Sequence, residues 1–469
     1  MIFQLISSPI LKQYAVVIIM NLTVLSVGLG LAWPSPMLVK LRNSTETILE
    51  HPISEEEGSW IVSFGFLVSS LTSFLPVLVL DRIGRKYTLL LGTLPRVVGA
   101  VFLTFASQVW MLIVGRTMCA ISDMYIFSVV PMYSSELASK EIRGALGTIL
   151  QIVCSLGVVI MLTVGPFASY VTTNALVLVV VLVGTFSVMI LPESPYFLYS
   201  RGRTDDCYKT LLFLRGNEGQ AKEELKEFDS TETDEKFSKI QLFKDKFFWK
   251  VLIIVTVIAS GAQIIGFNAV TFYLQTILES AETSVKPEVA SVIIGLIQIT
   301  ASLCTTGVTD RFGRKPILIV NLIGMMFGMV GLGVFFFIKD SSGVVSGFMN
   351  FLPLISLILV VFCYSAGPGS VNWALSAELF DNAGRSVGCP IAGVLAGLVL
   401  FFTTKYFAYF TLTIGAAVTY WAFSFNCLMY CIFIIFCVPE TKGKSFAEIQ
   451  EALGAKAHSS SKNPEKPKV

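Results

Sequence analysis

Charged residues and histidine are scarce in this chain of 469 residues. Asp, Glu, Lys and Arg together make up 14% of it, against roughly a quarter in a typical soluble domain, while hydrophobic residues make up 54%. The two histidines, His51 and His458, both lie outside the apolar runs, so neither can serve a membrane-embedded site. This balance excludes an ordinary soluble domain and favours a chain that has lipid as its solvent.

Other absences narrow the function. A net charge of +2 is too small to indicate a nucleic-acid partner. The nine cysteines show neither metal-ligand spacing nor an extracellular disulfide pattern. There is no nucleophile elbow, phosphate loop or cluster of metal ligands. We therefore expect no metal, no cofactor and no enzymatic activity.

What the chain does contain is a series of apolar runs near the length that spans a bilayer. The first, from Tyr14 to Trp33, is not clearly followed by a small-residue cleavage site, so it is expected to be a transmembrane helix and not a signal peptide. Twelve helices are predicted, at 13–33, 59–80, 87–107, 110–133, 145–165, 171–191, 248–278, 288–309, 316–338, 350–376, 387–408 and 414–438.

The loops between these runs differ in charge. Lys and Arg gather at 81–86, 140–143, 311–315 and 385, in the segment 192–247 and in the tail, whereas the loop at 44–57 is acidic. By the positive-inside rule both termini should be cytoplasmic. Asn43 then begins a glycosylation sequon on the outside, although a motif this short also arises by chance about as often.

The chain repeats itself. Asp81-Arg-Ile-Gly-Arg-Lys86 recurs as Asp310-Arg-Phe-Gly-Arg-Lys315, and two further motifs recur in the same order. An all-α fold of two parallel six-helix bundles is predicted, with the first at 1–191 and the second at 248–438. Between them, 192–247 should form short amphipathic cytoplasmic helices, and 439–469 a cytoplasmic tail that is disordered at its end.

The repeated motif places basic side chains and a turn-forming glycine at the cytoplasmic ends of helices. These groups can pair with nearby carboxylates, and such pairs are expected to hold the two halves together until the inside opens. A simpler alternative, positive-inside anchors, explains the cations but not the repeated carboxylate and glycine spacing. The expected cytoplasmic gate comprises Asp81, Arg82, Arg85, Arg116, Glu136, Arg143, Glu193, Asp310, Arg311, Arg314, Glu378, Arg385 and Glu440.

These motifs, with Gly115-Arg116, Pro131-x-Tyr133-x-x-Glu136, Pro192-Glu-Ser-Pro195 and Pro439-Glu440-Thr441-Lys442-Gly443, resemble those of the sugar porters of the major facilitator superfamily over nearly the whole chain. Trp33-Pro-Ser-Pro36 and Phe267-Asn-Ala-Val-Thr-Phe-Tyr273 look most like the insect facilitated trehalose and glucose transporters. The resemblance implies a plasma-membrane transporter of a hexose or a disaccharide such as trehalose, acting as a monomer in the bilayer.

The resemblance also implies a sugar site of amides and aromatic rings, groups that suit hydroxyls and the C–H face of a sugar. The matching substrate-binding residues are Gln151, Gln263, Asn268, Gln298, Trp373 and Tyr364. Phe272 and Tyr273 match aromatics that close the outer side. Any single amide could instead make an interhelical hydrogen bond.

Several positions depart from the family pattern. Ala262 stands where a second glutamine is common, Tyr196 where an arginine is usual, and Ala396-Gly397 where the family often offers Asn-Trp. The cytoplasmic charge network and the second half of the pocket are therefore both expected to be thinned. A larger or less polar substrate, a non-sugar polar solute, and a porter-like sugar sensor all stay open as alternatives, although the short tail disfavours a sensor.

Energy coupling is predicted from the first helix. Proton-coupled relatives carry an Asp there, but Asn21 to Trp33 contains no acidic residue, which favours facilitated diffusion. Asp123 in the fourth helix is the exception to an uncharged interior. A structural ion pair is the favoured interpretation of Asp123, with a proton or substrate site as the alternative.

Overall fold

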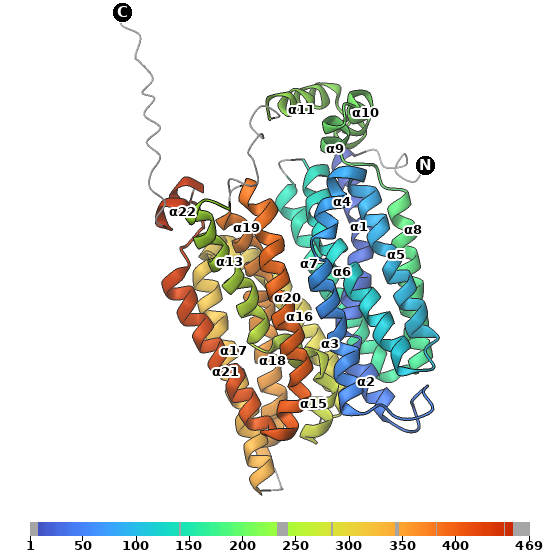
Figure 1. Cartoon of the computed structure of the whole chain (residues 1–469), viewed down its shortest axis with the longest axis vertical. Coiled ribbons are helices and arrows are strands. Elements are labelled where there is room, and N and C mark those ends of the chain that lie inside the picture. Colours follow the sequence, from blue (N-terminus) through green and yellow to red (C-terminus); the bar gives the residue numbers. More distant parts are fainter. Residues whose placement is uncertain are drawn as a thin grey trace, which may run out of the picture.

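The computed structural model describes residues 8–139, 142–231, 243–282, 285–342, 347–380, 382–444 and 446–453. This described part is built of helices and contains no strand. The helices form two side-by-side bundles with their axes roughly parallel (Figure 1). The first bundle contains α1 (Pro9–Ala32), α2 (Pro34–Arg42), α3 (Glu55–Thr72), α4 (Leu75–Ile83), α5 (Arg85–Thr104), α6 (Val109–Leu137), α7 (Arg143–Phe167) and α8 (Tyr170–Met189).

The second bundle follows a segment of short helices. That segment holds α9 (Pro195–Ser200), α10 (Thr204–Arg215) and α11 (Glu218–Thr231). The second bundle contains α13 (Lys246–Ile264), α14 (Phe267–Phe272), α15 (Leu274–Ala281), α16 (Pro287–Phe312), α17 (Arg314–Ser342), η3 (Gly347–Phe351), α18 (Leu352–Ala366), α19 (Pro368–Leu379), α20 (Asn382–Thr413), α21 (Ala416–Cys437) and, after it, α22 (Phe446–Ala452).

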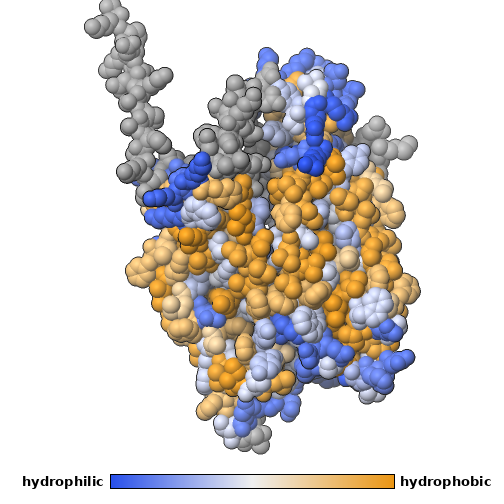
Figure 2. All heavy atoms as spheres, viewed as in Figure 1, coloured by the Kyte–Doolittle hydropathy of each residue, from blue (hydrophilic) through white to orange (hydrophobic). Residues whose placement is uncertain are grey.

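The twelve predicted membrane spans are found only if one bent pair of helices is counted as a single span. Eleven helical stretches are long and apolar enough to cross a membrane, and α3 with α4 makes a twelfth that bends by 53°. Pro76, at the start of α4, has no N–H to continue the hydrogen-bond ladder, which accounts for the bend. Large apolar side chains cover the outside of both bundles as a broad band, as expected of a surface that faces lipid (Figure 2).

Two spans predicted as continuous helices are broken. Gly266 takes a left-handed conformation, with φ of 86°, between α13 and α14. A Cβ there would lie 2.5 Å from the Phe423 ring, so only glycine fits. Gly367 and Pro368 separate α18 from α19. Broken helices free main-chain groups at mid-membrane depth, where transporters often bind their substrates.

One end of the molecule carries the beginning of α1, the short helices α9 to α11 and α22 (Figure 1), and we call it the linker end. The short helices are attached to the first bundle. The Gln13 amide donates to the Leu214 carbonyl at 3.0 Å, and the Arg215 guanidinium donates to the Leu137 carbonyl at 2.9 Å. The linker helices are therefore anchored to the first half.

Candidate functional site

At the linker end of the first half, the repeated motif forms a compact charge cluster. Arg85, only 2% exposed, donates from Nε and Nη2 to both oxygens of Glu136 at 2.9–3.1 Å. Glu193 Oε1 accepts the main-chain N–H groups of Arg85 and Lys86 and so caps the start of α5. Gly84, with φ of 95°, lets the carboxylate approach, since a Cβ there would lie 2.5 Å from Glu193 Oε2.

The second half repeats this arrangement residue by residue. Arg314 lies 3.3 Å from Glu378, and Glu440 accepts the main-chain N–H groups of Arg314 and Lys315, both at 3.0 Å. Gly313, with φ of 93°, again allows the close approach. The internal repeat read from the sequence is thus a repeat of contacts.

These ion pairs differ from expectation in one respect: each joins residues of the same half and not of opposite halves. The reason is local, because the turn before α5 lies against the ends of α6 and α9, and its counterpart against α19 and the chain after α21. Asp81 lies 3.7 Å from Arg85 but is 72% exposed. Arg82, Arg311 and Arg385 are also exposed. The side chains of Arg143 and Asp310 lie outside the described part.

The two equivalent carboxylates differ in their surroundings. Burial raises the pKa of Glu193, despite the N–H groups of Ser194, Lys86 and Arg85 that favour its charge, and its Oε2 is buried without a hydrogen-bond partner. Burial also acts to raise the pKa of Glu440, but four main-chain N–H groups outweigh it and lower that pKa. The charge of Glu440 is therefore the better stabilised of the two.

Arg116 was expected at the cytoplasmic gate, and this expectation is wrong. It lies two turns into α6 from the opposite end, where it donates to the Gly30 carbonyl at 2.7 Å and its guanidinium carbon lies 5.4 Å from the centre of the Trp33 ring. Pro34 has no N–H for the Gly30 carbonyl, so Arg116 satisfies an acceptor that the α1–α2 junction leaves open. Sequence proximity to the gate motifs was misleading.

Asp123, the carboxylate at mid-membrane depth, is paired. Arg96 of α5, which is 2% exposed, donates to Asp123 Oδ1 and to the Ser26 carbonyl of α1. This contact favours the structural interpretation of Asp123, since a buried charge needs a partner. Arg96 itself was not singled out in the sequence, where an arginine inside an apolar run was the available signal.

Three of the expected sugar-site residues form one group beside the helix break at Gly266. The Asn268 amide donates to Gln263 Oε1 at 2.6 Å and is also hydrogen-bonded to the Tyr364 hydroxyl. The Tyr364 ring stacks on Phe267, with 3.6 Å between ring centres and 5° between planes. Gln263, Asn268 and Tyr364 are all half-buried, so amide and aromatic groups remain reachable at one place.

Gln151 and Gln298 come from the two halves and lie near one contact between them. Ser155 of α7 and Ser302 of α16 are hydrogen-bonded at 3.0 Å. Gln151 lies one turn from Ser155, and Gln298 one turn from Ser302. Both glutamines are half-buried. Trp373 lies on α19, but its side chain is outside the described part.

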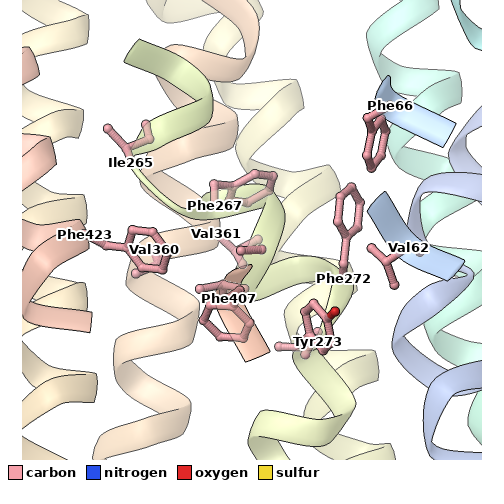
Figure 3. Close-up of a cluster of buried hydrophobic side chains, with 14 of the residues drawn as sticks. Val62, Phe66, Ile265, Phe267, Phe272, Tyr273, Val360, Val361, Phe407 and Phe423 are labelled. Carbon is pink, nitrogen blue, oxygen red and sulfur yellow. The ribbon is translucent and has the colours of Figure 1, made fainter. Parts of the chain in front are cut away.

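Of the two residues expected to close the outer side, Phe272 joins the two halves, and Tyr273 packs within the second half. Phe272 of α14 stacks on Phe66 of α3, with 5.4 Å between ring centres and 13° between planes. Tyr273 packs against Phe407 of α20 at 5.2 Å, and both Phe272 and Tyr273 are 2% exposed. Figure 3 shows this cluster, with Phe66 and Val62 facing Phe272 from the first half.

A second contact between the halves was missed from the sequence. Lys405 of α20 donates to Ser59 Oγ of α3 at 2.8 Å, and its ammonium lies 3.9 Å from the centre of the Trp60 ring. We call Lys405, Ser59 and Trp60 the opposite-end latch. A lysine inside a predicted helix was a visible signal, but its partner could not be read from the sequence.

Gly397 also lies between the halves. A Cβ on Gly397 would be 2.0 Å from Ser70 Oγ of α3, so the small residue allows close approach of α20 and α3. Ala396 beside it is buried. Gly397 stands where the family often has a tryptophan, and in this conformation the space beside it is filled by Ser70 of the other half.

The chain matches known proteins over most of its length. A family profile described as "Sugar (and other) transporter" matches residues 18–453. The facilitated trehalose transporter Tret1 of Polypedilum vanderplanki is 28% identical over 448 residues, covering 95% of this chain and 88% of the relative. Tret1 of Bombyx mori is also 28% identical over 448 residues, with 94% and 87% covered.

Solved structures show the same fold. The inward-open xylose transporter XylE of E. coli has a TM-score of 0.76 at 22% identity, covering 94% of this chain and 99% of that one. XylE bound to 6-bromo-6-deoxy-D-glucose has a TM-score of 0.73 at 22% identity. The predicted all-α fold and the predicted resemblance to sugar porters are confirmed. The chain therefore belongs to the sugar (and other) transporter family of the major facilitator fold, and it is a multi-pass membrane transporter and not an enzyme.

Proposed function

We propose that this protein is a facilitative sugar transporter of the plasma membrane that works as a uniporter by alternating access. The substrate is a hexose or a disaccharide such as trehalose. The Tret1 relatives, which are named as facilitated trehalose transporters, support a sugar of this size. The Arg96–Asp123 ion pair is the observation that supports transport without a coupled proton.

The linker end is taken to be cytoplasmic. It carries the basic motifs around Arg85 and Arg314, whereas the opposite end carries the acidic start of α3. Asn43 then lies in an exposed loop outside the cell, where its Oδ1 accepts hydrogen bonds from Thr45. Asn43 remains a predicted glycosylation site.

The contacts between the halves support alternating access. Phe66 with Phe272, the opposite-end latch and the Ser155–Ser302 hydrogen bond lie between the outer end and mid-depth. The charge clusters at the cytoplasmic end lie within each half, so they can stay intact when the halves separate there. We assign this conformation as closed to the outside, one of the two states that such a cycle requires.

The uniport assignment depends on the absence of a free carboxylate that could carry a proton. α1 contains no acidic residue at all. Asp123 is held by the Arg96 guanidinium, which also donates to the Ser26 carbonyl, so this carboxylate is engaged in an ion pair between α5 and α6. A carboxylate engaged in this way favours a structural role over a proton site, which supports uniport.

The direct test of the substrate is counterflow in proteoliposomes that contain the purified full chain. Each sugar, polyol or other polar solute of a panel is loaded inside, and uptake of a labelled trace outside is followed. Counterflow with trehalose or a hexose is expected. Counterflow with a different solute alone would favour the second candidate, a porter for a non-sugar, and binding without counterflow would favour a sensor.

The second candidate has one observation in its favour. Asn268 already donates to Gln263, and Gly397 packs on Ser70, so the second half offers fewer free polar groups than a standard hexose site would need. A less polar solute would need fewer hydrogen bonds from that half.

A further inference from the structure

A cavity of about 630 Å³ lies at the linker end of the first half, away from the sugar site. The turn before α5, the end of α8, and helices α9 and α10 form its walls. Four cationic side chains line it: Lys86, Arg201, Arg203 and Lys209. This cavity takes no part in the alternating-access cycle proposed above.

The cavity has an excess of positive charge. Its carboxylates are Glu193 and Asp206, so four cations against two carboxylates leave a net charge of +2. Both carboxylates are engaged: Glu193 Oε1 caps α5, and Asp206 lies 2.7 Å from Arg203. An anionic ligand would not have to displace either of them.

Two of the cations, Arg201 and Lys209, can still donate hydrogen bonds to a ligand. Arg201 donates from one nitrogen to the main-chain carbonyls of Asp81 and Arg82, and it forms no ion pair within the described part of the chain. Lys209 lies 3.8 Å from Asp206, and its side chain is 75% exposed. Guanidinium and ammonium groups placed in this way bind phosphate oxygens well.

The cavity lies where the apolar surface ends. The membrane spans that border it start at Arg85 and end at Met189. Ile83 and Tyr87 in its wall are 40% and 56% exposed, and Leu91 and Leu94 continue the exposed apolar face down α5. In Figure 2 the apolar band gives way to a polar surface at the linker end. A ligand with a charged head and apolar chains fits both surfaces at once.

We propose that this cavity binds the headgroup of an anionic glycerophospholipid from the cytoplasmic leaflet. The phosphate contacts Arg201 and Lys209, and the acyl chains lie along α5. Because α9 and α10 supply these cations while the turn before α5 supplies Lys86, a bound lipid ties the linker helices to the first half. The lipid therefore stabilises the docked linker.

The test compares thermal stability and lipid retention of the full chain in lipid–detergent micelles. Phosphatidylglycerol is the anionic probe, phosphatidylcholine the zwitterionic control, and glycerol 3-phosphate the headgroup without chains. The variant is Arg201→Gln with Lys209→Gln. Lys222→Gln is the matched control, because Lys222 is an exposed linker lysine that pairs with Glu218 at 3.5 Å outside the cavity.

Phosphatidylglycerol should raise the Tm above the phosphatidylcholine value and remain bound in native mass spectrometry. Each cation removed should weaken its apparent affinity about fivefold, so the double variant should need about 25-fold more lipid, while Lys222→Gln should behave as the parent. The proposal is overturned if phosphatidylglycerol and phosphatidylcholine act alike, if the double variant responds as the parent does, or if glycerol 3-phosphate reproduces the full effect. In the last case the cavity binds a soluble phosphate and not a lipid.

Discussion

Replacing Gly397 by leucine should prevent the outer side of the transporter from closing. Gly397 lies where α20 of the second half crosses α3 of the first, and a Cβ there would be 2.0 Å from Ser70 Oγ and 3.0 Å from Ser70 Cβ. Ser70 is buried and its hydroxyl donates to the Phe66 carbonyl at 2.5 Å, so it cannot easily move aside. The halves would have to separate to admit the larger side chain.

The size of the effect follows from the cost of overpacking. Extra carbon atoms forced into a packed interface cost about 1–3 kcal/mol. Because the strain exists only when the halves meet, it acts on the closed state alone. A difference of that size shifts the ratio of outward-open to outward-closed protein by about 5- to 150-fold.

The assay uses a cysteine that is buried only when the outer side is closed. Val62 is 1% exposed and lies beside Phe272 between the halves (Figure 3). In a Val62→Cys background, labelling by a membrane-impermeant thiol reagent from outside should be slow, and Gly397→Leu should speed it at least fivefold. The same background without Val62→Cys corrects for the native cysteines.

Gly393 provides the control, one turn along the same helix. A Cβ on Gly393 would have no heavy atom within 4 Å, so Gly393→Leu adds the same bulk at a position where the first carbon meets no neighbour. Its labelling rate should match the parent. Equal labelling in Gly397→Leu and Gly393→Leu would refute the idea that Gly397 permits closure.

Five further substitutions test other parts of the molecule. Lys405→Met removes the cation from Trp60, an interaction of about 0.5–2 kcal/mol, and should also speed outside labelling of Val62→Cys; an unchanged rate would mean that the latch is incidental. Gln151→Leu and Gln263→Leu should each weaken apparent sugar affinity severalfold at normal surface expression, since a lost hydrogen bond costs about 1 kcal/mol; unaltered competition curves would place the substrate elsewhere. Glu440→Gln should lower the Tm in detergent more than Glu193→Gln, because the surroundings lower the pKa of Glu440 but raise that of Glu193; the reverse order would contradict the assigned environments.

Most of the fold could be predicted from the sequence because its signals are local or repeated. Apolar length predicted twelve spans, and the recurrence of Asp81–Lys86 at 310–315 predicted two equivalent halves, which the contacts of Glu193 and Glu440 reproduce. The breaks in two spans were not predicted. Gly266 looks like any glycine in an apolar run, and the Phe423 ring that leaves no room for a Cβ there is far away in the chain.

The site was predicted less completely, because its contacts join residues that are far apart in the chain. The group of Gln263, Asn268 and Tyr364 was anticipated through the family resemblance. The partner of Asp123 was not, because Arg96 is 27 residues away on another helix. Gly397 was predicted only as a departure that thins the pocket, and its contact with Ser70 of the other half was not foreseen. Contacts across the two halves depend on the conformation of the transporter, which no sequence motif records.

The most direct test of uniport is sugar accumulation under an imposed proton gradient. Proteoliposomes containing the full chain take up the sugar identified by counterflow, at several outside pH values, with and without a proton ionophore. The pairing of Asp123 with Arg96 predicts that uptake stops when inside and outside concentrations are equal, and that the ionophore changes neither its rate nor its end point. Accumulation above equilibrium that collapses with the ionophore would contradict uniport and make Asp123 a proton carrier.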